Sequence, residues 1–167
     1  MPQPIGSYWK TIQKIFHRSF YFSLHYAIAT VNPDGMPHVT PIGSLVLTDG
    51  NKGFYFEEYP SQLPNNLEEC PRVCILAVDS GKFFWIKSLI KGAFAAPPGI
   101  RLYGTVGEKR LATPDELRLW HRRISPFRLT KGYRILWKSM RYVREIYFES
   151  YEPIKLGAMT KKSGESE

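Results

Sequence analysis

The chain has 167 residues and a net charge of +8, with 23 Lys and Arg residues against 15 Asp and Glu residues. A hydrophobic fraction of 43% is sufficient for one core, so we expect a single domain over residues 1–160 and a disordered polar tail over residues 161–167. No apolar run approaches the roughly 18 residues that a membrane span needs, and the first residues lack the features of a secretion signal. These observations predict a cytoplasmic protein with no membrane span.

The first predicted element is a short amphipathic helix. Trp9, Ile12 and Phe16 recur at helical spacing behind Ser7, which has the side chain of an N-cap residue. The helix is therefore expected over residues 8–16, and residues 20–26 are expected to lead into the first strand.

Runs rich in β-forming residues, separated by turn residues, predict about six strands. The clearest turn is Asn32-Pro33-Asp34-Gly35, in which Pro presets φ and Asp and Gly tolerate the conformations that follow. The predicted strands cover residues 27–31, 37–42 with a continuation over 44–47, 53–56, 73–78, 100–109 and 145–151. Because most of them are joined as hairpins, the pattern favours a mainly β fold with short helices, a small antiparallel barrel, with an α+β sandwich as the alternative.

Helical segments are expected between these strands. Residues 61–69 suit a short helix, and Thr113-Pro114-Asp115-Glu116 has the composition of a capping box followed by a helix that ends before Ser125-Pro126. Residues 83–86 fit either a strand or a helix, and residues 135–137 suit a helix.

The positive charge is concentrated in the second half of the chain. Residues 1–81 carry a net charge of −2 and residues 82–167 carry +10, and nine basic residues but no acidic one lie between Leu117 and Arg144. This basic block attracts anions in general. It is either a solvated face or a contact for the anionic tail of a cofactor, a membrane surface or nucleic acid. No helix-turn-helix, zinc or RNA-recognition signature accompanies it, which argues against nucleic acid.

Few residues carry the signature of catalytic or metal chemistry. Cys70 and Cys74 are four residues apart with no metal-ligand pattern around them, so free thiols are expected. His25 and His38 belong to neighbouring predicted strands, either as half-buried strand residues or as site residues that donate hydrogen bonds to a bound group or ligate it. The sequence predicts no metal site, and the catalytic residues stay unknown.

Three segments together indicate a family. They are the hairpin over residues 27–41, the run Asn66-Leu67-Glu68-Glu69-Cys70-Pro71-Arg72-Val73, and the strand over residues 101–106 with the capped helix after it. Their order resembles the FMN-binding split-barrel family of pyridoxamine 5'-phosphate oxidase-like proteins. The resemblance implies a six-stranded antiparallel split β-barrel that forms a homodimer with the cofactor at the subunit interface.

The resemblance also implies residues for the cofactor site. Val39, Thr40, Pro41 and Ile42 would run along the flavin ring. Ser61 and Gln62, with Asn66 in support, would hold the phosphate at a helix N-terminus, where N–H groups are free. The chain departs from the family pattern here, because Glu57 and Glu58 precede Ser61 and no basic residue follows it directly. Either a basic side chain from elsewhere (Lys52, Lys87 or the basic block, of the same or of the partner subunit) meets the phosphate, or FMN is not the ligand.

The sequence thus predicts a flavin (FMN)-binding oxidoreductase with a small-molecule substrate. The alternative is a non-catalytic split-barrel protein that binds haem or a deazaflavin. Vitamin B6 oxidase activity is not expected, because the C-terminal Arg-Leu…Arg substrate signature of that enzyme is not recognisable.

Overall fold

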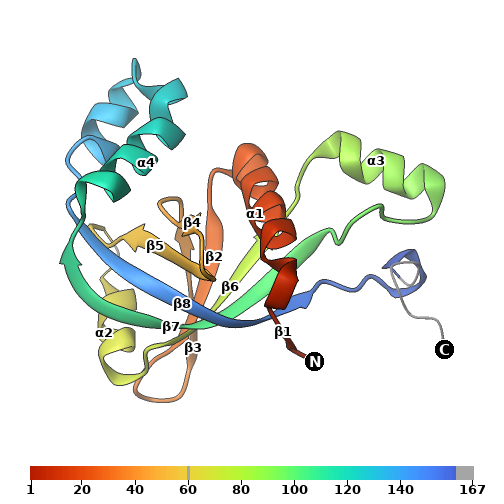
Figure 1. The fold of residues 1–167 in the computed structure, drawn as a ribbon, viewed down its shortest axis with the longest axis horizontal. Helices are drawn as coiled ribbons and strands as arrows, with labels where there is room; N and C mark the ends of the chain where they lie inside the picture. The colour runs from red at the N-terminus through yellow and green to blue at the C-terminus, as the bar shows by residue number, and fades with distance from the viewer. Residues whose placement is uncertain (60, 161–167) are drawn as a thin grey trace.

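One antiparallel sheet of eight strands forms the body of the protein in the computed structural model, which describes residues 1–59 and 61–160 (Figure 1). The order along the sheet is β3-β2-β6-β7-β8-β5-β4, and β1 pairs with β8. The strands are β1 (Gln3–Pro4), β2 (Tyr26–Val31), β3 (Pro37–Ile42), β4 (Val46–Thr48), β5 (Lys52–Phe56), β6 (Arg72–Val78), β7 (Gly99–Leu111) and β8 (Tyr142–Pro153).

The mainly β, antiparallel architecture is confirmed, but the predicted number of six strands is wrong. The predicted continuation of the second strand breaks at Gly43, where an added Cβ would lie 2.9 Å from the Leu24 carbonyl oxygen. Ser44 then satisfies both backbone groups of Phe56 through its hydroxyl, each at 3.1 Å. The chain therefore leaves the β2–β3 hairpin and pairs as β4 with β5. The short β1 adds the remaining strand.

In the described part of the chain, four α-helices and three short helical turns connect the strands, and a fourth turn follows β8. The helices are α1 (Trp9–Ser23), α2 (Gln62–Glu69), α3 (Lys82–Lys91) and α4 (Pro114–Ile124), and the turns are η1 (Gly6–Tyr8), η2 (Ser125–Phe127), η3 (Tyr133–Trp137) and η4 (Gly157–Thr160). None of the helices within these described residues is long and apolar enough to cross a bilayer. The predicted disordered tail over residues 161–167 lies outside the described part of the chain.

The first helix is longer than predicted and starts without the predicted cap. Ser7 lies inside η1, and α1 begins after Tyr8 with no side-chain cap hydrogen bond. The helix continues to Ser23 because Phe20 extends its buried face and packs on Tyr26, with ring centroids 6.2 Å apart. Residues 20–23 are therefore helical and do not lead into the first strand as extended chain.

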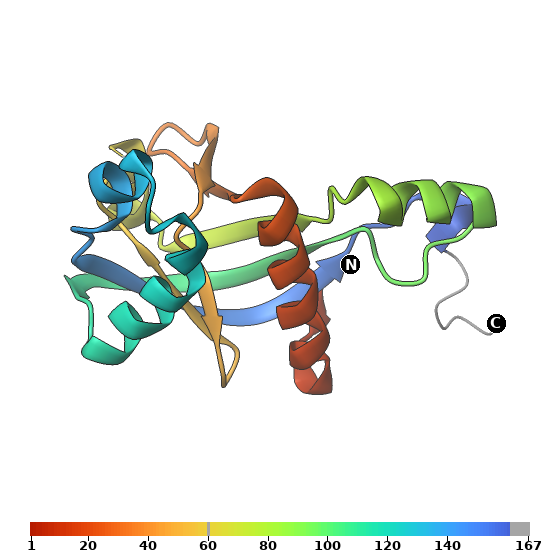
Figure 2. The same cartoon turned by 90° about the horizontal axis from the view of Figure 1, so that it is seen from above.

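The later helices follow the sequence more closely. The Thr113 hydroxyl accepts a hydrogen bond from the Glu116 N–H, and the Glu116 carboxylate accepts one from the Thr113 N–H, which confirms the capping box of α4. Residues 83–86, for which two structures were possible, form part of α3. This helix extends away from the sheet (Figures 1 and 2) and leaves Phe83, Ile86 and Ile90 exposed.

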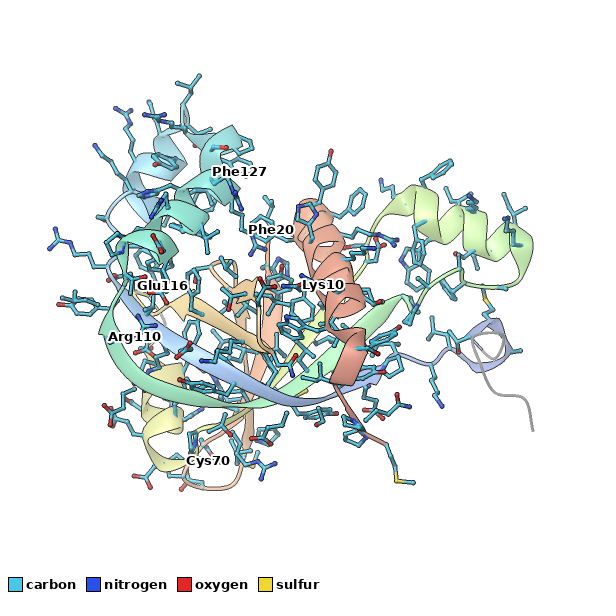
Figure 3. All side chains as sticks on the ribbon, viewed as in Figure 1. Lys10, Phe20, Cys70, Arg110, Glu116 and Phe127 are labelled. Atoms are coloured by element: carbon cyan, nitrogen blue, oxygen red, sulfur yellow. The ribbon has the colours of Figure 1, made fainter. Side chains whose placement is uncertain are left out.

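Two hydrophobic clusters hold the elements together. The larger one packs α1 against the sheet, and the smaller one packs Trp120 and Ile124 of α4 against Phe54 and Phe56 of β5. Arg110 of β7 secures the start of α4 through two hydrogen bonds to the Glu116 carboxylate, at 2.8 and 2.7 Å (Figure 3). The helix that carries Arg118, Arg122 and Arg123 of the basic block is thereby fixed beside β4 and β5.

Candidate functional site

The strand predicted to run along the flavin ring is an edge strand. Because β3 pairs only with β2 among the described strands, one row of its backbone N–H and C=O groups has no strand partner. Val39 and Pro41 are exposed on one face, with Val39 61% exposed, and Thr40 is half-buried on the other. Ile42 is buried in the main core, so its side chain is not available to a ligand.

Asn66 joins α2 to this hairpin. Its side chain is fully buried, its Nδ2 donates to the Thr30 hydroxyl at 2.9 Å, and its Oδ1 accepts from the Gln62 amide at 3.0 Å. Thr30 is the cross-strand partner of His38 on β3. The structure therefore brings Gln62 and Asn66 together with the hairpin, and the partners of Asn66 make it a residue that positions α2.

Ser61 stands immediately before α2. It is exposed, and its side chain makes no cap hydrogen bond to the helix. Its hydroxyl is thus not used in starting the helix, which leaves it available to a ligand at the first turn of α2.

The two carboxylates that precede Ser61 are both held by other groups. Glu57 is buried, and its Oε2 accepts hydrogen bonds from Arg144 Nε at 2.6 Å and from the Tyr55 hydroxyl at 3.0 Å. The Glu58 carboxylate accepts the backbone N–H groups of Arg141 and Tyr142, at 2.6 and 3.0 Å. The repulsion of a phosphate expected from the sequence is therefore reduced by pairing, which no local pattern in the sequence indicated.

The buried Glu57 carboxylate also changes the pKa of the Tyr55 side chain that donates a hydrogen bond to it. Burial, and then the Glu57 carboxylate, raise the pKa of Tyr55 well above its ordinary value. The phenol consequently stays protonated and acts as a hydrogen-bond donor. Lys109 adds a further positive charge, with its Nζ 3.6 Å from Glu57 Oε1.

Three of the basic side chains suggested as phosphate partners have other contacts or positions within one subunit. Lys52 pairs with Glu145 at 3.6 Å and lies over the Tyr147 ring. Arg144, from the basic block, binds Glu57. Lys87 is on α3, which projects from the body. The sequence hypothesis also allows a basic side chain of a second subunit to meet the phosphate.

The histidines and cysteines do not form a shared site. His25 precedes β2 and is exposed, whereas His38 is half-buried with its Nδ1 3.3 Å from the Thr40 hydroxyl. Tyr26 pairs with Ile42 and Thr30 with His38, so the two imidazoles lie at opposite ends of the hairpin. Cys70 and Cys74 are free thiols, as predicted.

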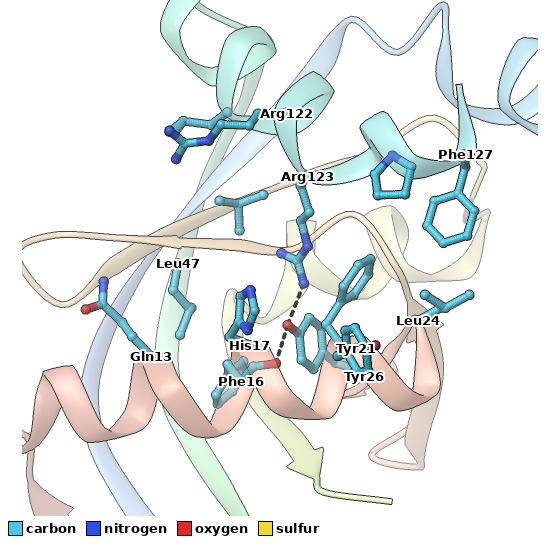
Figure 4. Close-up of a pocket in the computed structure, with 14 residues that line it drawn as sticks. Gln13, Phe16, His17, Tyr21, Leu24, Tyr26, Leu47, Arg122, Arg123 and Phe127 are labelled. Carbon is cyan, nitrogen blue, oxygen red and sulfur yellow. Dashed lines mark hydrogen bonds between the residues drawn. The ribbon is translucent and has the colours of Figure 1, made fainter. Parts of the chain in front are cut away.

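The sequence did not reveal a cavity of about 600 Å³ between α1 and α4 (Figure 4). Aromatic and aliphatic side chains line it together with His17, Arg122 and Arg123. The only signal in the sequence was the basic block, which does not by itself predict a cavity. It forms because α1 and α4 both pack beside β4.

Comparison with known proteins identifies the family. A model of the pyridoxamine 5'-phosphate oxidase family matches residues 16–127, and the chain belongs to this family, as the resemblance predicted. No curated protein matches.

Solved structures support the fold assignment. The structure of HupZ from Group A Streptococcus is 18% identical with a TM-score of 0.58, covering 90% of this chain and 96% of that one. An FMN-binding protein from Syntrophomonas wolfei is 11% identical with a TM-score of 0.57, covering 89% and 92%. A structure described as F420 reductase is 18% identical with a TM-score of 0.54, covering 84% and 94%. At these identities the likeness shows the fold alone.

Proposed function

We propose that the chain binds a flavin, FMN in the first instance, between β3 and the start of α2, and acts as an oxidoreductase on a small molecule. One observation carries the proposal: the hydrogen bond from Asn66 to Thr30 fixes α2 to β2, the strand that pairs with β3, so α2 and the edge strand belong to one unit. A split-barrel relative whose structure is that of an FMN-binding protein supports the choice of cofactor.

The residues present fit such a cofactor in three respects. The free backbone edge of β3 offers carbonyl oxygens and the N–H groups of its non-proline residues to the polar edge of a flat heterocycle, whereas Pro37 and Pro41 have no N–H to donate. Ser61 and the N–H groups at the start of α2 offer donors to a phosphate. Glu57 and Glu58, which would repel it, are engaged by Arg144 and by the backbone before β8.

In this arrangement each residue has a limited task. The backbone of Val39 to Ile42 would orient the ring, Ser61 and Gln62 would bind the phosphate, and Asn66 would hold α2 in place. FMN, when bound, supplies the electron-transfer chemistry. The described residues identify no protein acid or base for the reaction.

A homodimer would complete the site. Val31, Met36 and Val39 of the β2–β3 hairpin are large apolar residues that are exposed in one subunit. Exposed apolar side chains grouped around one hairpin are typical of a surface that a partner covers. A second copy placed there would enclose a cofactor lying along β3 and would bring further side chains to its phosphate.

A deazaflavin is the second candidate, with haem as the third. The structural likeness to an F420 reductase and the positive charge between Leu117 and Arg144 favour the deazaflavin, because an anionic cofactor tail would meet complementary charge. A haem bound by both His25 and His38 of one subunit is not supported, since these residues lie apart.

The test is to identify the cofactor directly. The purified protein is denatured, and the released small molecule is analysed by mass spectrometry and absorbance, followed by titration of the cofactor-free protein with FMN, F420 and haemin. We expect FMN to bind in a 1:1 ratio to the subunit. Saturable binding of F420 or haemin with no binding of FMN would refute the proposal and select the corresponding alternative.

A further inference from the structure

The cavity between α1 and α4 has the size and lining of a binding site for a small molecule. Its volume of about 600 Å³ falls in the usual range for such sites. Phe16 and Phe20 of α1 line it together with Leu119 of α4 and Phe127 of η2. Phe16 and Phe127 are labelled in Figure 4. These side chains would surround an apolar body of aromatic or aliphatic character.

Arg123 places a positive charge against this apolar lining. Its guanidinium lies 3.6 Å from the centroid of the Phe20 ring, and its Nη2 donates to the Tyr26 hydroxyl at 2.6 Å. Its Nη1 donates to the Leu45 carbonyl oxygen. The Tyr26 hydroxyl in turn donates to the Phe16 carbonyl oxygen at 2.9 Å, so the side chain is held in one orientation (Figure 4).

The charge of Arg123 is not balanced by a carboxylate. Both of its hydrogen-bond acceptors are neutral, and across residues 1–59 and 61–160 no carboxylate forms an ion pair with it. A guanidinium has five N–H donors, of which these contacts use two. Arg123 is half-buried against the Phe20 and Tyr26 rings, and this burial lowers the pKa of its guanidinium. A partly desolvated cation without a counter-charge is stabilised when an anion joins it.

The other polar side chains that line the cavity bring no negative charge to oppose Arg123. His17 and Arg122 line it, and no Asp or Glu does. Gln13 is directed to the Thr48 carbonyl oxygen at 3.2 Å. The cavity therefore combines an apolar wall with cationic donors.

We propose that this cavity binds a small carboxylate with an apolar body, and that Arg123 is the charge partner of the carboxylate. One partly desolvated guanidinium balances one negative charge, and its planar donors match the two oxygens of a carboxylate. The cavity is separate from the phosphate end of the proposed flavin site, whereas Ile42 at the ring end pairs with Tyr26, which lines the cavity. The Tyr26–Ile42 pair is at the end of the β2–β3 hairpin that adjoins the cavity, and the Thr30–His38 pair is near α2. The two pairs are four residues apart, which corresponds to about 13 Å along the strands.

The test compares a charged probe with its neutral analogue. Binding of 1-naphthoate and of 1-naphthamide to the purified full chain is measured by titration calorimetry. We expect 1-naphthoate to bind at least about tenfold more tightly, equivalent to about 1.4 kcal/mol. Arg123→Met should remove this preference, while Arg118→Met, on the same helix and paired with Asp115, should retain it. Equal binding of the two probes, or an unchanged preference in Arg123→Met, would overturn the proposal.

Two further measurements keep the result interpretable. If Arg123→Met does not fold, Leu119→Trp, which fills the cavity from α4, should abolish 1-naphthoate binding in a folded protein, and retained binding would refute the location. FMN added beforehand should leave the affinity for 1-naphthoate unchanged. Competition between the two would show that they share a site and would overturn the claim of a separate one, whereas failure of FMN to bind would count only against the proposed flavin function.

Discussion

Arg144 on β8 donates a hydrogen bond from Nε to the Glu57 carboxylate at 2.6 Å, and both side chains are buried, Glu57 to 1% exposure and Arg144 to 11%. This pair joins the residue after β5 to β8. It also neutralises a negative charge shortly before α2, where the proposed phosphate site lies.

Replacing Arg144 by Met should destabilise the fold strongly. Among residues 1–59 and 61–160, the variant leaves the buried Glu57 with Lys109 as its remaining ion-pair partner. We expect the free energy of unfolding to fall by about 3 kcal/mol, as is typical when one partner of a buried ion pair is removed. Chemical denaturation measures the change. Arg118→Met, which breaks an exposed pair with Asp115, serves as the control and should change little. A similar small loss in both variants would contradict this prediction.

Ser61→Ala should weaken FMN binding without affecting the stability of the fold. The Ser61 side chain makes no cap hydrogen bond, so its loss removes only a contact with the ligand. We expect the Kd for FMN to rise about fivefold, since one hydrogen bond contributes about 1 kcal/mol. Fluorescence titration gives the Kd. An unchanged Kd would remove Ser61 from the phosphate site.

The two candidate N-cap residues should respond differently to substitution. Thr113→Ala removes a cap seen in the structure and should lower the free energy of unfolding by about 1 kcal/mol. Ser7→Ala should have almost no effect, because Ser7 does not cap α1. Thermal or chemical denaturation of both variants gives the comparison. A larger loss in Ser7→Ala would show that the sequence prediction was right and the structure misassigned.

The Arg110–Glu116 pair should make stability depend on pH in the acid range. The hydrogen bonds from Arg110 are the largest cause that holds the pKa of Glu116 below its ordinary value of 4.5. The folded protein therefore binds this proton less readily than the unfolded chain. The stabilisation is complete above the ordinary pKa and is lost as the pH falls through the lower pKa of the folded state.

Comparison with Glu116→Gln isolates this effect. The wild type should be more stable than the variant at pH 7, and the difference should shrink as denaturation is repeated toward pH 3. A difference that stays constant with pH would exclude the carboxylate charge as its source.

Val39→Asp should test the proposed dimer surface. A charge at this exposed position of β3 would have to be buried if a second subunit covers it, which is unfavourable. We expect the wild type to sediment as a dimer and the variant as a folded monomer with weakened FMN binding. A matched substitution at Ile90, exposed on α3, shows whether that helix is the contact instead. A dimer retained in Val39→Asp would place the interface elsewhere.

Local chemistry in the sequence determined much of the fold. The Asn32-Pro33-Asp34-Gly35 turn, the alternation along β7 and β8, and the capping box at Thr113 each depend on residues close together in the chain. Such features specify their conformation by themselves, and together their order indicated the family. The same order carried the prediction of Val39, Ser61 and Asn66 as cofactor residues, which stays a prediction.

Tertiary packing decided what lies between the elements. The extension of α1 to Ser23, the break at Gly43 and the pairing of Glu57 with Arg144 join residues that are far apart in sequence or depend on how closely two segments approach. The cavity beside Arg123 arises in the same way, from two helices more than 90 residues apart. Sequence patterns report preferences over a few neighbours. Long-range pairing of charges and the space left between packed helices depend on the assembled fold.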